Sequence, residues 1–83
     1  MARRYEYRVC QVQQQYVTFV NGEWQGRVPL SEAAGAADPF ASCTKTWDYL
    51  QRAGPDGWEL VAALSYQKDG SSQYDLLYLK REL

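Results

Sequence analysis

The chain has 83 residues, with nine basic and ten acidic side chains and a net charge of −1. A chain this short closes a single hydrophobic core, so one domain covering residues 1–83 is predicted. The charge balance disfavours nucleic acid or an anionic membrane as partner. The N-terminal residues contain no apolar run typical of a signal peptide or membrane span, which predicts a cytoplasmic location.

The sequence has no histidine and two cysteines, Cys10 and Cys43. This set cannot supply the four Cys or His ligands of the usual zinc site. Two reduced thiols that pack as small apolar groups are the expected state, and a metal shared between subunits is the alternative. No cofactor is predicted.

Residues 5–20 are rich in Tyr, Val and Gln and contain no Gly or Pro, which predicts one long or bent strand. The apolar alternation of its first half stops at two glutamines, so either the strand leaves the core or a bulge near residues 13–15 resets the pattern.

Asn21 and Gly22 suit a type I′ turn, in which both central residues have positive φ. They predict a hairpin with a short returning strand over residues 23–28. Residues 29–37 are small and polar, and we expect a surface loop there.

The only helix is predicted to begin at Asp38, with Pro39 at its first position and Ser42 as a competing cap. Gly54 is expected to end it in the left-handed conformation, before Pro55. Apolar residues at helical spacing define the face predicted to meet the core: Phe40, Cys43, Trp47 and Leu50.

Two more strands are predicted after the helix, over residues 58–67 and 73–81, joined by a turn at residues 68–72. In the first of them Trp58 is expected in the core, in alternation with polar or small residues. The residues predicted to share its wall are Leu60, Ala62, Leu64 and Tyr66.

These elements predict an α+β fold: a small antiparallel sheet of about four strands with one helix, in the order β-β-α-β-β. The last strand is apolar on both faces, since Leu77 and Leu79 alternate with Tyr74, Leu76 and Tyr78. One helix cannot cover both faces. Either the first hairpin folds over the second face, or another subunit covers it.

Three motifs resemble a family of small bacterial proteins known as domain of unknown function 4177. They are Tyr-Glu-Tyr-Arg-Val at residues 5–9, Gly-Trp-Glu-Leu-Val at residues 57–61, and the closing Leu-Tyr-Leu-Lys-Arg at residues 77–81. Arginine stands at Arg8 where the family pattern has lysine. The resemblance implies an antiparallel sheet with one helix and no established activity. Relative to the shortest members of that family, residues 13–38 look like a hairpin and loop insertion within the single domain.

The lack of histidine disfavours an enzyme, because acid–base catalysis would need strongly shifted groups of other types. Glu59 is the best single candidate, but it is expected to point outward and pair with Arg81, Lys80 or Arg8. Cys10 has no neighbouring base in sequence and is interpreted as structural.

Two hypotheses remain, and the aromatic residues are central to both. In the first, the protein is a non-catalytic interaction module that self-associates, with interface candidates Trp24, Tyr74, Leu76 and Tyr78. In the second, it binds a nucleotide-like or other anionic metabolite between subunits. The ligand-binding candidates are Arg8, Arg27, Tyr5, Tyr7 and Glu59.

Overall fold

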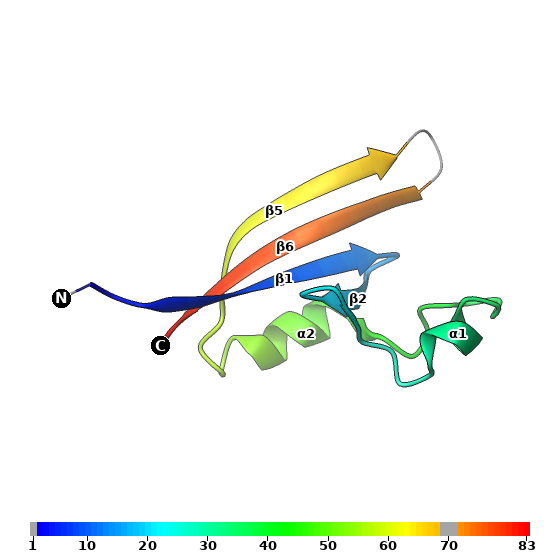
Figure 1. Ribbon diagram of the computed structural model, residues 1–83, viewed down its shortest axis with the longest axis horizontal. Coiled ribbons are helices and arrows are strands. Elements are labelled where there is room, and N and C mark those ends of the chain that lie inside the picture. Colours follow the sequence, from blue (N-terminus) through cyan, green and yellow to red (C-terminus); the bar gives the residue numbers. More distant parts are fainter. Residues whose placement is uncertain (1, 69–71) are drawn as a thin grey trace.

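The computed structural model describes residues 2–68 and 72–83, so most of the predicted turn at residues 68–72 lies outside the described residues. The described chain forms one antiparallel sheet with two helices, and its strand order is β3-β2-β1-β6-β5, with β4 pairing to β2 (Figure 1). The predicted α+β class is confirmed, while four strands and one helix were too few. The elements are β1 Tyr5–Gln13, β2 Tyr16–Val20, β3 Glu23–Trp24, α1 Leu30–Ala33, β4 Thr44–Lys45, α2 Thr46–Ala53, β5 Glu59–Lys68 and β6 Ser72–Glu82.

The predicted long strand is in fact two strands. Gln14 and Gln15 have φ of 51° and 70° and form a tight turn between β1 and β2. Glutamine is not a usual residue at positive φ, which is why the pattern did not reveal the turn. The pairing of β1 with β2 shifts register between Gln11 and Val12. The buried Thr18 hydroxyl donates a hydrogen bond to the Gln13 side chain at 2.7 Å.

The Asn21-Gly22 turn is confirmed, with φ of 50° and 83°. The Asn21 N–H donates to the Val9 carbonyl and the Asn21 side-chain oxygen accepts from the Val9 N–H, both at 2.8 Å. The returning strand β3 is only two residues long, much shorter than the predicted residues 23–28.

The segment predicted as a surface loop contains the one-turn helix α1. The Pro29 carbonyl accepts hydrogen bonds from the N–H groups of Glu32 and Ala33, at 3.0 and 2.9 Å. Ala33 is buried and holds the turn against the loop. Proline directly before a run of good helix formers favours this turn, a signal that the loop prediction overlooked.

The main helix α2 begins at Thr46, well after the predicted start at Asp38. Residues before it form turns and then β4, where Lys45 pairs with Tyr16 of β2. The Thr46 N–H and hydroxyl both donate to the Gln15 carbonyl, at 2.9 and 3.0 Å. Strand pairing with a distant segment therefore sets the helix start, and local capping residues do not.

The face of α2 also differs from the prediction. Tyr49, Leu50 and Ala53 pack on the core, whereas Trp47 is 54% exposed. Gly54 keeps right-handed helical angles, and the left-handed residue at this end of the helix is Gly57, with φ of 94°.

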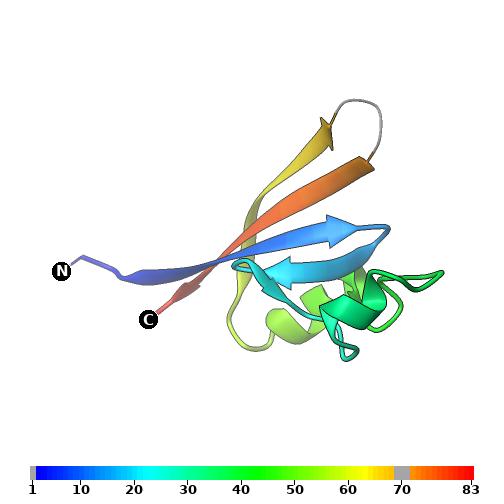
Figure 2. The same ribbon diagram turned by 45° about the vertical axis from the view of Figure 1, so that its right-hand side comes forward.

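The core is small and lies between α2 and the adjoining part of β1, β2 and β6, as the two ribbon views show (Figures 1 and 2). Trp58 is 7% exposed, so its predicted core position is confirmed, and Leu79 is 1% exposed. The core cluster comprises Cys10, Val12, Val17, Ala53, Trp58, Leu77 and Leu79.

The far part of the β5–β6 hairpin extends beyond the helices (Figures 1 and 2). The prediction that Leu60, Ala62, Leu64 and Tyr66 share the core wall with Trp58 is wrong, because all four are exposed. A register shift between Leu60 and Ala62 also breaks the alternation on which that prediction relied. The first hairpin, β2–β3, pairs with β1 within the same sheet, so it does not fold over the second face.

Candidate functional site

The sheet has a second face, opposite α2, that we call the open face. One row of paired residues crosses five strands on it: Trp24, Phe19, Gln11, Leu76 and Leu64. Directly opposed residues of antiparallel strands point to the same side, while their chain neighbours Cys10 and Leu77 point into the core. Among the described residues, the core cluster and α2 lie on the other side of the sheet.

All four predicted interface residues lie on this open face. Trp24 and Leu76 belong to the row above, Tyr78 pairs with Val9 and Ala62, and Tyr74 pairs with Tyr66. Tyr7, Leu64 and Tyr66 add exposed surface, with 64%, 48% and 40% of each residue accessible. The four residues that the sequence predicted as interface candidates therefore lie on one face of the folded sheet.

Aromatic contacts order part of this face. The rings of Phe19 and Trp24 meet edge to face with centroids 5.5 Å apart, and those of Tyr66 and Tyr74 stack at 5.3 Å. Trp24 is half-buried, its ring lies over Gly26, and its indole N–H donates to the Val28 carbonyl at 2.8 Å. The indole polar group is thus satisfied by its own hairpin, and Trp24 presents its ring at one edge of the open face.

A different cluster lies on the helix side, around Trp58. The guanidinium carbons of Arg8 and Arg81 lie 4.1 and 4.5 Å from the centroid of the Trp58 ring. Cation–π contacts of this kind stabilise a partly buried arginine. Sequence reasoning placed Trp58 in the core but missed both arginines, since their positions follow from the pairing of Arg8 with Leu79 and of Glu6 with Arg81.

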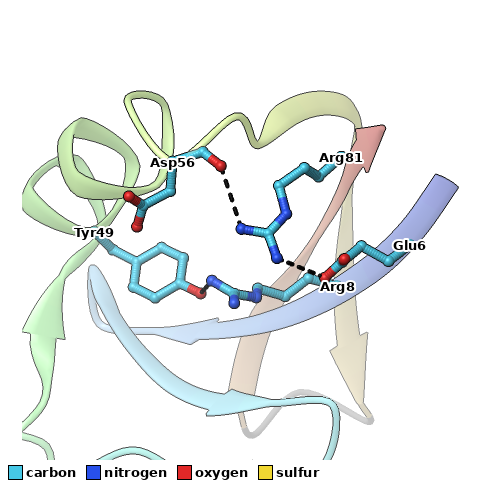
Figure 3. Close-up of polar contacts among 5 residues, drawn as sticks. All are labelled: Glu6, Arg8, Tyr49, Asp56 and Arg81. Carbon is cyan, nitrogen blue, oxygen red and sulfur yellow. Dashed lines mark hydrogen bonds and ion pairs between the residues drawn. The ribbon is translucent and has the colours of Figure 1, made fainter. Parts of the chain in front are cut away.

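Hydrogen bonds fix both arginines in this cluster (Figure 3). Arg81 donates to the Glu6 carboxylate at 2.9 Å and to the Asp56 carbonyl at 3.2 Å. Arg8 donates to the Tyr49 hydroxyl at 2.7 Å. Glu59 points outward, as predicted, and lies opposite Lys80 in the strand register. The other two predicted partners are wrong, because Arg81 forms its ion pair with Glu6 and Arg8 lies on the opposite face.

The Arg81 side chain also explains a glycine in the turn before Trp58. A Cβ at Gly57 would come within 3.2 Å of the Arg81 side chain, and Gly57 has positive φ. Glycine is therefore needed at that position for both its backbone and its contact. The motif at residues 57–61 thus combines a turn residue, a core tryptophan and the start of β5.

Cys10 has the environment of a structural thiol. Burial raises the pKa of Cys10, although its hydrogen bond with Tyr49 and the charge of Arg8 act in the opposite sense. Burial is the main cause that raises the pKa of Tyr49, and the charge of Cys10 and its hydrogen bond with Tyr49 raise it further. Both groups stay protonated at neutral pH, whereas a nucleophilic cysteine needs a thiolate. Cys43 is also free and buried.

The predicted ligand-binding residues do not converge on one site. Tyr5, Tyr7 and Glu59 belong to the open face, as their pairing with Glu82 and Lys80 requires, whereas Arg8 shares the opposite face with Leu79. Arg27 lines a separate small pocket beside Ala33. None of these five residues lines the open, mainly apolar groove of about 870 Å³ between Val12, Phe40 and Trp47.

Within residues 2–68 and 72–83, no three His, Cys, Asp or Glu side chains gather as a metal site. No helix of this part of the chain is long and apolar enough to cross a membrane. Comparison of the sequence and fold with protein-family models, curated proteins and solved structures finds no match.

Proposed function

We propose that the protein is a non-catalytic interaction module that self-associates through the open face of its sheet. The observation that carries this proposal is the row from Trp24 to Leu64, which crosses five strands on the face that α2 leaves uncovered. The row is apolar except for Gln11 at its centre. Extended apolar surface marks contact sites in small proteins, and two-fold association buries it economically. The resemblance to domain of unknown function 4177 stays a prediction and adds no activity.

The groups considered for catalysis support the same proposal. Cys10 is a buried, protonated thiol, and Glu59 is exposed at the start of β5 with no hydrogen bond or ion pair to its side chain among the described contacts. Acid–base chemistry needs a positioned group with a matched pKa. Neither residue meets that requirement.

Sedimentation at micromolar concentration tests the proposal, with a dimer or larger closed oligomer expected for the wild-type chain. Tyr7→Glu and Leu76→Glu place a charge on the open face and should shift the protein towards monomer. Tyr7 is the safer position because it is already 64% exposed. Gln51→Glu, on the exposed surface of α2, adds the same charge elsewhere and serves as the matched control.

A monomeric wild-type protein, or an assembly that both charged variants leave intact, would contradict self-association through this face. Circular dichroism of each variant separates loss of assembly from loss of folding.

Binding of a small anion is the second candidate function. Arg8 lines a pocket of about 190 Å³ together with Arg52 and Tyr49, and among the described contacts its guanidinium makes no ion pair. A planar guanidinium is suited to a carboxylate or phosphate. Tryptophan fluorescence against a nucleotide and metabolite panel tests this, because Trp58 touches Arg8. No response across the panel would remove the candidate.

A further inference from the structure

Strand β5 forms one edge of the sheet and lacks most of the features that usually protect an edge strand. It spans Glu59–Lys68, pairs with β6 on one side, and ends the strand order on the other. Residues 59–67 are all exposed. A free edge presents a row of unpaired N–H and C=O groups to any strand that can align with it.

The devices that usually protect an edge are missing from most of β5. Residues 60–67 contain no charge, no proline and no glycine. The opposite edge, β3, is protected by being two residues long. A bulge at Val61 protects the base of β5 but leaves residues 62–67 in regular pairing with β6. These six residues form the open part of the edge.

We propose that a second copy of this chain pairs with this edge, β5 against β5 in antiparallel orientation, with the two-fold axis at Leu64. This inference goes beyond the proposed function: edge pairing leaves the open faces uncovered, so it is a second contact between copies, with a strand and a register of its own. The sheets of two copies then join into one continuous sheet, and the open faces of the two copies form one surface.

The side chains of β5 favour this register. Ala62, Leu64 and Tyr66 pair with Tyr78, Leu76 and Tyr74 and so lie on the open face. A two-fold axis at Leu64 places Leu64 opposite Leu64 of the second copy, and Ala62 opposite Tyr66. The smallest side chain then faces the largest on both sides of the axis, which keeps bulky rings from meeting.

The other side of β5 gives a contact that is specific to edge pairing. In the same register, Ala63 lies opposite Ser65 of the second copy, on the side away from the open face. Packing of two open faces against each other would leave Ala63 and Ser65 on the outside of the assembly. Opposed residues of antiparallel strands have Cα atoms about 4.5 or 5.5 Å apart, within the range that a disulfide bridges.

Cysteine cross-linking in the full chain tests the pairing. Ala63→Cys and Ser65→Cys are made as separate variants, mixed in equal amounts under mild oxidation and resolved without reductant. A disulfide-linked dimer is expected from the mixture, in which random exchange makes about half of the dimers mixed. Neither variant alone should cross-link, because like positions of the two copies lie diagonally, about 7–8 Å apart.

The wild-type chain is the control for background oxidation, since Cys10 and Cys43 are both buried. A cross-link in the mixture alone supports β5 pairing in this register. No cross-link from an assembly that sediments as an oligomer, or equal cross-linking by one variant alone, overturns the edge pairing and leaves self-association through the open face standing. A monomeric wild-type chain overturns both.

Discussion

The two ends of the sheet are stabilised in different ways. Where α2 covers the sheet, Trp58 fills the core together with Leu79 and Cys10. At the far end, β5 and β6 pair only with each other and with β1, and residues 59–67 of β5 are exposed. Backbone pairing holds that end in shape, together with the stacked rings of Tyr66 and Tyr74 and a hydrogen bond from the Ser65 hydroxyl to the Asp75 carboxylate at 2.7 Å. The comparison indicates that the covered end provides most of the stability, while the far end is the part that offers surface to a partner.

Two tryptophans give the sharpest test of this difference. Trp58→Ala should cost about 3–5 kcal/mol of unfolding free energy, because it removes a large buried ring and leaves two guanidinium groups without their contact. Trp47→Ala should cost less than about 1 kcal/mol, since Trp47 is exposed on α2. Urea denaturation measures both. Equal losses would show that the two regions do not differ as described.

Two leucines make the same comparison within the β5–β6 hairpin. Leu79→Ala is expected to destabilise by about 2–5 kcal/mol, because Leu79 is almost fully buried. Leu64→Ala should change the free energy of unfolding by about 0.5 kcal/mol or less when measured at a concentration where the protein is monomeric. A large loss from Leu64→Ala in the monomer would mean that the far end has a core of its own.

Alkaline pH should destabilise the covered end. The pKa of Cys10 and the pKa of Tyr49 are raised on folding, mainly by burial. A group with a raised folded pKa contributes stability that is fully present below its unfolded pKa, which is 9.0 for the cysteine, and that is lost as pH rises through the folded pKa.

Thermal unfolding should therefore show a fall in melting temperature above pH 9.0. Tyr49→Phe removes one of the two titrating groups and should reduce the slope of that fall. A slope unchanged by Tyr49→Phe would assign the alkaline effect to other residues.

The smallest difference in unfolding free energy between the two regions is expected when a carboxylate of each is neutralised. Glu6→Gln removes the half-exposed ion pair with Arg81 and is expected to cost up to about 1 kcal/mol. Glu59→Gln should change the unfolding free energy by less than this, since Glu59 is exposed at the start of β5. Chemical denaturation of the two variants in parallel gives the difference. A marked gain in stability from Glu59→Gln would point to a strained carboxylate kept for function.

Local sequence determined several features of this protein without help from the rest of the chain. Asn21 and Gly22 form the predicted turn because few other residues tolerate positive φ at both positions. The alternation of Leu77 and Leu79 with Tyr74, Leu76 and Tyr78 correctly divided β6 between a buried face and an open face. The interface candidates on that strand therefore followed from a pattern of period two.

Contacts between distant segments decided the remainder. The start of α2 at Thr46 depends on β4 pairing with β2, and the partner of Arg81 depends on β1 lying beside β6. The alternation along residues 58–67 led to the prediction that Leu64 lies in the core. Such alternation indicates only that a strand has an apolar side. It does not indicate whether a helix covers that side. Strand order put β5 at an edge beyond α2, and this placement turned a predicted core wall into exposed surface.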